Sequence, residues 1–258
     1  MTGGPDDKAI GDAPSSFKDH FSAHADSYAA YRPTYPQALM RFLADCCEER
    51  RLAWDCATGN GQTAVALVPY FDRIIATDAS EAQICSAMPH PRIDYRVARA
   101  ESSGLDPRST DLITVSQALH WFDIDRFFDE VMRVLVPGGV FSAWSYELCV
   151  VKASIDAQVL GLYRQVDDYW PPERRMVEGR YRDIELPMPA IAAPEFEMTA
   201  SWTVDAMLGY LRTWSASQRY LRERGSDPVA TIEEELRALW GAGRREVRWP
   251  LALKVGRA

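Results

Sequence analysis

Residues 51–62 read Arg51-Leu-Ala-Trp-Asp55-Cys-Ala-Thr-Gly59-Asn-Gly61-Gln62, and this stretch decides the fold. Residues 51–57 predict a short apolar strand, residues 58–61 a turn that contains glycine, and residues 62–68 a helix that ends at Pro69. Glycine lets the backbone approach a ligand without a side-chain clash, and a helix that begins there presents free N–H groups. The stretch therefore predicts a ligand-binding turn at the end of a strand.

The residues that follow continue this alternation. Strands are expected at 73–78, 93–98, 111–116 and 140–144, and helices at 81–88, after Ser80 as N-cap, and at 124–135. The turn Pro137-Gly138-Gly139 is expected to separate the second of these helices from the next strand. Strands that alternate with helices indicate right-handed crossovers and a parallel, doubly wound α/β sheet, whose ligand lies beyond the carboxyl ends of the strands.

The alternation stops after Tyr146. Residues 150–190 carry a helical pattern and predict a helical cap insertion over the active-site edge, while residues 51–146 form the cofactor-binding core. Residues 195–258 supply C-terminal strands and helices, with helices near 204–217 and 228–240 and a last strand at 246–255. We expect a single domain over 17–258 and a disordered tail over 1–16, which is rich in Gly, Asp, Pro and Ser.

Composition restricts the class of partner. A net charge of -8 argues against a nucleic-acid partner, because such a protein needs a basic face. No apolar run approaches the roughly 20 residues of a membrane span, and the first residues lack the apolar stretch of a secretory signal. The 5 cysteines show no metal-ligand spacing. We therefore expect a cytoplasmic, reduced protein without a metal site that acts neither on nucleic acid nor at a membrane.

Two carboxylates help to choose between cofactors. Residues 59–64 match the G-x-G-x-x-A pattern of a dinucleotide site, which leaves an NAD-dependent oxidoreductase open. However, Asp55 directly before the turn would repel a pyrophosphate, whereas an acidic rim favours the cationic ammonium and sulfonium of S-adenosylmethionine. Asp78 ends the second strand, where its carboxylate is expected to accept hydrogen bonds from ribose hydroxyls.

Residues 50–145 resemble the class I S-adenosylmethionine-dependent methyltransferases. The likeness rests on the motif I acid at Asp55, the ribose acid at Asp78, an adenine-side motif at Ala100-Glu101 and the turn Leu135-Val-Pro-Gly-Gly139. One departure is Ala57, which stands where the family pattern D-x-G-x-G-x-G has its first glycine. The resemblance implies a Rossmann-like, mostly parallel seven-stranded sheet with an antiparallel last strand, and S-adenosyl-L-methionine as cofactor. It places the following residues at the cofactor: Asp55, Ala57, Thr58, Gly59, Gly61, Gln62, Asp78, Ala79, Gln83, Ala100, Glu101 and Gln117.

Residues 17–50 resemble the N-terminal lid helices of the methyltransferase type 11 or trans-aconitate methyltransferase-like group, through the pattern F…A…Y…RPxYP. In such a lid, the rings of Tyr28 and Tyr31 are expected near the sulfonium by cation–π attraction, with Tyr28 also a candidate catalytic and substrate residue. Arg32 is a candidate partner for a carboxylate of the cofactor or substrate. The alternative is that the tyrosines only fasten the lid to the domain.

The acceptor site is expected after the fourth strand, at Gln117-Ala-Leu-His120-Trp121. His120 is interpreted as a general base, an acceptor-orienting donor or a packed structural residue, and Trp121 as a pocket wall or part of the core. The C-terminal part also resembles the trans-aconitate group and adds Trp214, Arg212 and Arg219 as candidate substrate residues. The two arginines fit a solvated helix face equally well.

The leading hypothesis is methyl transfer to a small molecule, at an oxygen of an anionic carboxylate. A phenol or quinone-type acceptor, methylated on oxygen or carbon, is the first alternative. An NAD-dependent oxidoreductase and a binding protein that has lost transfer are the others. The sequence predicts no oligomeric state.

Overall fold

The computed structural model describes residues 33–258, and its centre is a seven-stranded sheet with strand order β3-β2-β1-β4-β5-β7-β6. β1 to β5 pair in parallel, and β7 runs antiparallel to both β5 and β6. This confirms the predicted Rossmann-like sheet and its antiparallel last strand. The strands are β1 (Leu52–Cys56), β2 (Arg73–Asp78), β3 (Ile93–Val97), β4 (Thr110–Ser116), β5 (Leu135–Tyr146), β6 (Glu197–Trp202) and β7 (Arg245–Arg257).

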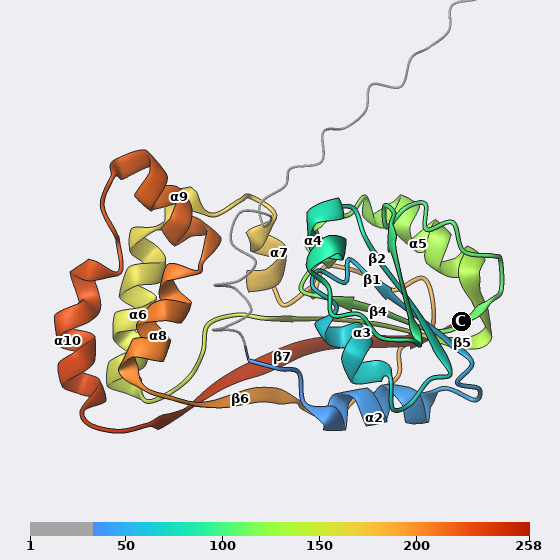
Figure 1. Cartoon of the computed structure of the whole chain (residues 1–258), viewed down its shortest axis with the longest axis horizontal. Coiled ribbons are helices and arrows are strands. Elements are labelled where there is room, and N and C mark those ends of the chain that lie inside the picture. Colours follow the sequence, from blue (N-terminus) through green and yellow to red (C-terminus); the bar gives the residue numbers. More distant parts are fainter. Residues whose placement is uncertain (1–32) are drawn as a thin grey trace, which may run out of the picture.

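Helices cover both faces of the sheet. α2 (Gln37–Cys46) and α3 (Gln62–Leu67) bury apolar side chains on one face, and α5 (Ile124–Val134) buries its own on the other, with α4 (Glu81–Ser86) beside β2 and β3. Beyond the sheet lies the helical group, which we define as α6 (Ala153–Gln165), α8 (Val204–Arg212), α9 (Ser215–Arg224) and α10 (Ala230–Trp240) (Figure 1). The short helices are η2 (Leu119–Trp121), η3 (Asp167–Tyr169) and α7 (Arg174–Glu178).

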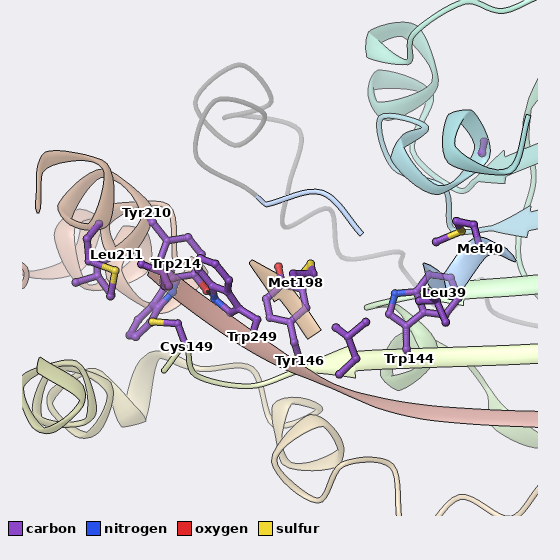
Figure 2. Packing of buried hydrophobic residues seen from close by; sticks show 14 of the residues in the cluster. Leu39, Met40, Trp144, Tyr146, Cys149, Met198, Tyr210, Leu211, Trp214 and Trp249 are labelled. Carbon is purple, nitrogen blue, oxygen red and sulfur yellow. Dashed lines mark hydrogen bonds between the residues drawn. The ribbon is translucent and has the colours of Figure 1, made fainter. Parts of the chain in front are cut away.

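One apolar core joins the helical group to the sheet. Figure 2 follows it along β7, from Leu39 and Met40 of α2, past Met198 and Trp249, to Tyr210 of α8. Trp249 is fully buried, and its indole N–H donates to the Tyr210 hydroxyl at 3.2 Å. The helical group therefore packs on an extension of the sheet through a shared core, and the two parts do not have separate ones.

The segment Pro137-Gly138-Gly139 is not the predicted turn. It lies inside β5, where the pairing with β4 shifts register between Thr110 and Leu112. The residues at this shift bond with the end of the chain: the Gly138 N–H donates to the Ala258 carbonyl at 2.8 Å, and the Ala258 N–H donates to Gly139 at 2.9 Å. Gly138 adopts a φ of 80°, which suits glycine. The prediction was wrong because these contacts with the distant terminus let the strand continue through a bulge.

Two further elements differ from the expectation. The helix predicted near 204–217 is two helices, α8 and α9, because the chain is extended at Trp214. β6 was not located from the sequence, although it fills the outer edge of the sheet. The predicted tail over 1–16 and residues 17–32 of the predicted lid lie outside the described residues. Across 33–258, every helix is too short or too polar to cross a membrane.

Candidate active site

The carboxyl ends of β1, β2 and β4 lie together at one edge of the sheet, since the strands are parallel and adjacent. The Asp78 carboxylate connects two of the turns there. Its Oδ2 accepts from the Gly59 N–H at 2.9 Å, and its Oδ1 accepts from the Ser80 N–H at 2.9 Å. A carboxylate offers roughly four acceptor positions. This carboxylate is therefore held in place by the backbone in a way that remains compatible with further donors.

Asp55 does not form the acidic rim that the sequence predicted. Its side chain is completely buried beneath the turn, where Oδ2 accepts from the Thr58 hydroxyl at 2.5 Å and Oδ1 from the Thr114 hydroxyl at 2.8 Å. Burial raises the pKa of the Asp55 carboxyl from 3.8 to about 6, against the lowering effect of the bonds from Thr58, Thr114 and the Ala64 amide. The observed contacts make Asp55 the residue that fastens the turn to β4.

The turn after β1 has an unusual backbone. Ala57, Gly59 and Gly61 all adopt positive φ, at 54°, 58° and 85°. A Cβ on Gly61 would collide with the Tyr95 hydroxyl, so only glycine fits there. Ala57 stands where the family pattern has a glycine, and the backbone there has the positive φ that favours glycine. An alanine in this region is strained by about 1–2 kcal/mol.

The other predicted cofactor residues surround this turn. Thr58 is buried and its N–H donates to the Thr77 carbonyl at 2.9 Å, while Gln62 lies 3.4 Å from the Pro33 carbonyl. Glu101 accepts from the N–H of Asp123, the N-cap of α5, at 3.1 Å. Ala79 and Ala100 occupy the loops that follow β2 and β3, and Gln83 lies in the first turn of α4. Their contacts with a cofactor stay predictions.

Gln117 directly follows β4 and has a φ of 55°, a conformation that is uncommon for a residue with a side chain. Its side-chain amide donates to the Tyr146 carbonyl at 3.1 Å and accepts from the Tyr146 N–H at 3.3 Å. Both functional ends of the amide therefore hold the end of β5 against the end of β4. Strained residues of this kind gather at functional sites.

His120 lies in η2, next to that strand end. It is 8% exposed, and its Nδ1 is 2.9 Å from the Tyr181 hydroxyl. Burial, and then the charge of Arg174, lower the pKa of His120 from 6.5 to about 3. The imidazole is therefore neutral near pH 7. Trp121 contacts it, with ring centroids 4.6 Å apart.

Sequence reasoning missed Tyr181, which follows α7. Burial raises the pKa of its hydroxyl, so it is protonated near pH 7. Tyr181 and the preceding Arg180 both have positive φ, at 54° and 56°. The only signal in the sequence was the arginine-rich stretch around it, which gives no indication of a histidine partner.

The candidate substrate residues of the helical group have partners within it. Arg212 donates to Asp227 at 2.7 Å and to Glu233 at 2.6 Å, and Arg219 pairs with Glu223 at 2.7 Å on the exposed face of α9. The Trp214 ring packs against those of Tyr163, Trp170 and Tyr210. These contacts explain the three residues structurally, so we do not retain them as acceptor residues.

The remaining predicted residues, Tyr28, Tyr31 and Arg32, lie outside the described residues. Within 33–258, no group of three His, Cys, Asp or Glu side chains is arranged to hold a metal ion. The cysteines are all free thiols.

Comparison with known proteins gives one consistent result. Residues 54–143 match the Methyltransferase domain family. A candidate methyltransferase of Dictyostelium discoideum is 34% identical over 228 residues, which covers 86% of this chain and 87% of that protein. A candidate S-adenosylmethionine-dependent methyltransferase of Saccharomyces cerevisiae is 25% identical over 82% of this chain and 84% of its own. The solved structure of a candidate type II methyltransferase from Anaeromyxobacter dehalogenans is 46% identical, with a TM-score of 0.83 over 88% of this chain and 98% of that one.

Proposed function

Since the chain belongs to the class I S-adenosylmethionine-dependent methyltransferases, we propose that it methylates a small molecule at an oxygen of an anionic carboxylate. Membership of this family favours methyl transfer over the NAD-linked alternative that residues 59–64 left open. We infer the identity of the acceptor atom from the surroundings of His120.

The residues at the strand ends fit the methyl donor. Gly59 and Gly61 bring bare backbone to the turn, and the nearest atom to a Cβ placed on Gly59 is Gln83 Oε1 at 3.7 Å. Beside them, the backbone-held carboxylate of Asp78 suits vicinal ribose hydroxyls. We assign Ala100 and Glu101 to the adenine side, as the motif predicts. When bound, S-adenosylmethionine supplies an electrophilic methyl group on its sulfonium.

One feature of the site supports this choice of acceptor: His120 is buried and its Nδ1 is bonded to the Tyr181 hydroxyl, so it is poorly placed to act as a general base. A phenol, thiol or carbon acid must lose a proton before or during transfer, and a group with a pKa of about 3 has little tendency to take it. A carboxylate is already anionic near pH 7 and needs no base. Among the residues that the structure describes, the site therefore supports an acceptor that arrives ionised.

His120 then has an orienting role. We infer that the protonated Tyr181 hydroxyl is the donor in its 2.9 Å contact with Nδ1, an arrangement that leaves the proton of the neutral imidazole on Nε2. The Nε2–H is a donor that suits an oxygen of the acceptor. The Trp121 ring, which contacts His120 at a tilt of 44°, helps to exclude water from it. Alignment and exclusion of water are the main contributions a protein makes to such a displacement.

The test uses aromatic acids that carry both a carboxylate and a phenol, such as 4-hydroxybenzoate, together with aliphatic acids. We expect methyl esters, which alkali hydrolyses, and a rate that is flat from about pH 6 to 9. Predominant formation of aryl ethers, with a rate that rises with pH, would exclude the carboxylate. Binding of S-adenosylhomocysteine, measured by calorimetry, tests the cofactor site independently.

A further inference from the structure

Arg174 begins α7, after the segment Trp170-Pro171-Pro172-Glu173, and α7 packs against η2, which carries His120. The bond between Tyr181 and His120 fastens the segment after α7 to the same place. Figure 1 shows α7 between the helical group and the strands of the sheet. Arg174 therefore stands on the helix that adjoins the proposed acceptor site.

Aromatic rings hold the guanidinium of Arg174. Its Cζ lies 4.8 Å from the centroid of the Trp170 ring and 5.8 Å from that of Tyr163, and its Nε donates to the Tyr163 hydroxyl at 3.3 Å. Stacking on an aromatic face stabilises a cation without using its N–H donors. Arg174 is half-buried.

The charge of Arg174 is not neutralised directly. Within 33–258 it forms no ion pair, whereas Arg212, Arg219 and Arg237 each contact a carboxylate within 2.8 Å. Hydrogen bonds connect Arg174 to one carboxylate indirectly. Its Nε donates to the Tyr163 hydroxyl, and that hydroxyl donates to Glu178. Its terminal nitrogens donate no hydrogen bond to any described residue. A guanidinium in this state presents a planar pair of donors that matches a carboxylate.

We propose that Arg174 recognises the acceptor, by binding its carboxylate group with the terminal nitrogens of a guanidinium held on Trp170 and Tyr163. This inference rests on the proposed anionic acceptor and replaces Arg212 and Arg219 in that role. The electrostatic influence of Arg174 on His120 supports it, because it indicates that the field of the guanidinium extends to η2. Arg174 is then a specificity-determining residue that sequence analysis did not select.

The first test measures binding of carboxylates without turnover. Since Trp170 lies under the guanidinium, succinate bound at Arg174 is expected to change tryptophan fluorescence, while uncharged dimethyl succinate is not. The change is expected to vanish in Arg174→Gln and in Trp170→Phe, and to persist in Arg175→Gln, the exposed neighbour on α7. Wild-type protein that gives no response to succinate, or Arg174→Gln that responds as wild type does, would overturn the inference.

The second test separates this inference from the proposed function. With an acid that the wild type methylates, Arg174→Gln is expected to raise KM at least tenfold with a smaller change in kcat, and Arg174→Lys to recover only part of the loss. Unchanged affinity for S-adenosylhomocysteine shows that the variants are folded. Equal KM values in Arg174→Gln and wild type would end the role of Arg174 and leave carboxylate methylation intact. Methyl transfer to phenols and not to carboxylic acids would instead refute the proposal that the acceptor is a carboxylate.

Discussion

The Tyr181 hydroxyl lies 2.9 Å from Nδ1 of His120, and this contact joins two segments that are far apart in the sequence. In the proposed reaction the tyrosine is the donor in this contact, and the proton of the buried, neutral imidazole is therefore on Nε2. The positioning of the acceptor in the proposed reaction therefore depends on a tyrosine outside the motifs at the strand ends.

Tyr181→Phe removes this bond and leaves a buried nitrogen without its partner. We expect unfolding free energy to fall by about 1–3 kcal/mol and kcat to fall with little change in affinity for S-adenosylhomocysteine. Urea unfolding and steady-state kinetics measure the two effects. Tyr70→Phe is the control, because it removes a 3.4 Å bond to Gln37 at an exposed position. Wild-type kcat in Tyr181→Phe would refute the positioning role.

Asp78→Asn keeps the shape of the side chain but loses its charge and one of its acceptor oxygens. Charge-assisted hydrogen bonds are worth about 1.5–3 kcal/mol, so affinity for S-adenosylhomocysteine is expected to fall roughly 10- to 100-fold. Calorimetric titration measures it. The matched control is Asp94→Asn on β3, whose carboxylate pairs with Arg73 and Arg96. Equal affinities in the two variants would show that Asp78 does not contact the donor.

Ala57→Gly relieves the left-handed strain in the turn after β1. Relief of about 1–2 kcal/mol, less about 0.5–1 kcal/mol for the greater freedom of glycine in the unfolded chain, predicts a net change between about 0 and 1.5 kcal/mol in favour of the variant. Urea unfolding at constant pH measures it. Ala157→Gly, at an exposed position inside α6, is expected to have the opposite sign and to lose about 1 kcal/mol. A loss at both positions would mean that residue 57 is not strained.

The raised pKa of Asp55 makes folding depend on pH. The folded carboxyl holds its proton up to about pH 6 and the unfolded one only to about 3.8, so the folded state binds more protons in between. Stability from this group is therefore fully present below pH 3.8 and is lost as pH rises through 6. The loss is on the order of 3 kcal/mol, at about 1.4 kcal/mol per pKa unit.

The difference in unfolding free energy between wild type and Asp55→Asn isolates this effect, because His120 contributes with the opposite sign. The lowered pKa of His120 adds stability as pH rises towards 6.5 in both proteins, so it cancels. We expect the difference to favour wild type less at pH 7 than at pH 4. For Asp94, whose pKa is lowered chiefly by its bond from Arg96, the corresponding difference has the reverse slope. If the difference in unfolding free energy between wild type and Asp55→Asn did not change with pH, burial would not raise the pKa of Asp55.

Local signals in the sequence predicted the parallel part of the fold. β1, its turn and α3 follow directly from an apolar run, two glycines and a helical pattern, and β2 was located at its observed bounds of Arg73–Asp78. These elements are determined by neighbouring residues. The bulge in β5 was missed because it depends on Ala258 at the other end of the chain.

Side-chain roles were harder to predict for the same reason. Asp55 was located in its motif, but its burial depends on Thr114 of another strand. Arg212 and Arg174 are both arginines near aromatic residues in the sequence. The fold brings Asp227 and Glu233 to Arg212, and it leaves Arg174 without an ion pair among the described residues. Charge alone therefore did not indicate which arginine was available.

The long strand β7 has a consequence for how this protein can be altered. Because a single buried core follows it from α2 to α8, we expect no boundary at which the helical part separates from the sheet on heating (Figure 2). A graft of residues 150–190 from a relative would replace α6 and α7 but keep the host's β6 and β7. The side chains of the grafted helices would then no longer pack correctly against those of the host's strands. Exchange of acceptor preference between relatives therefore requires the whole region from α6 to the end of β7 to be transplanted together.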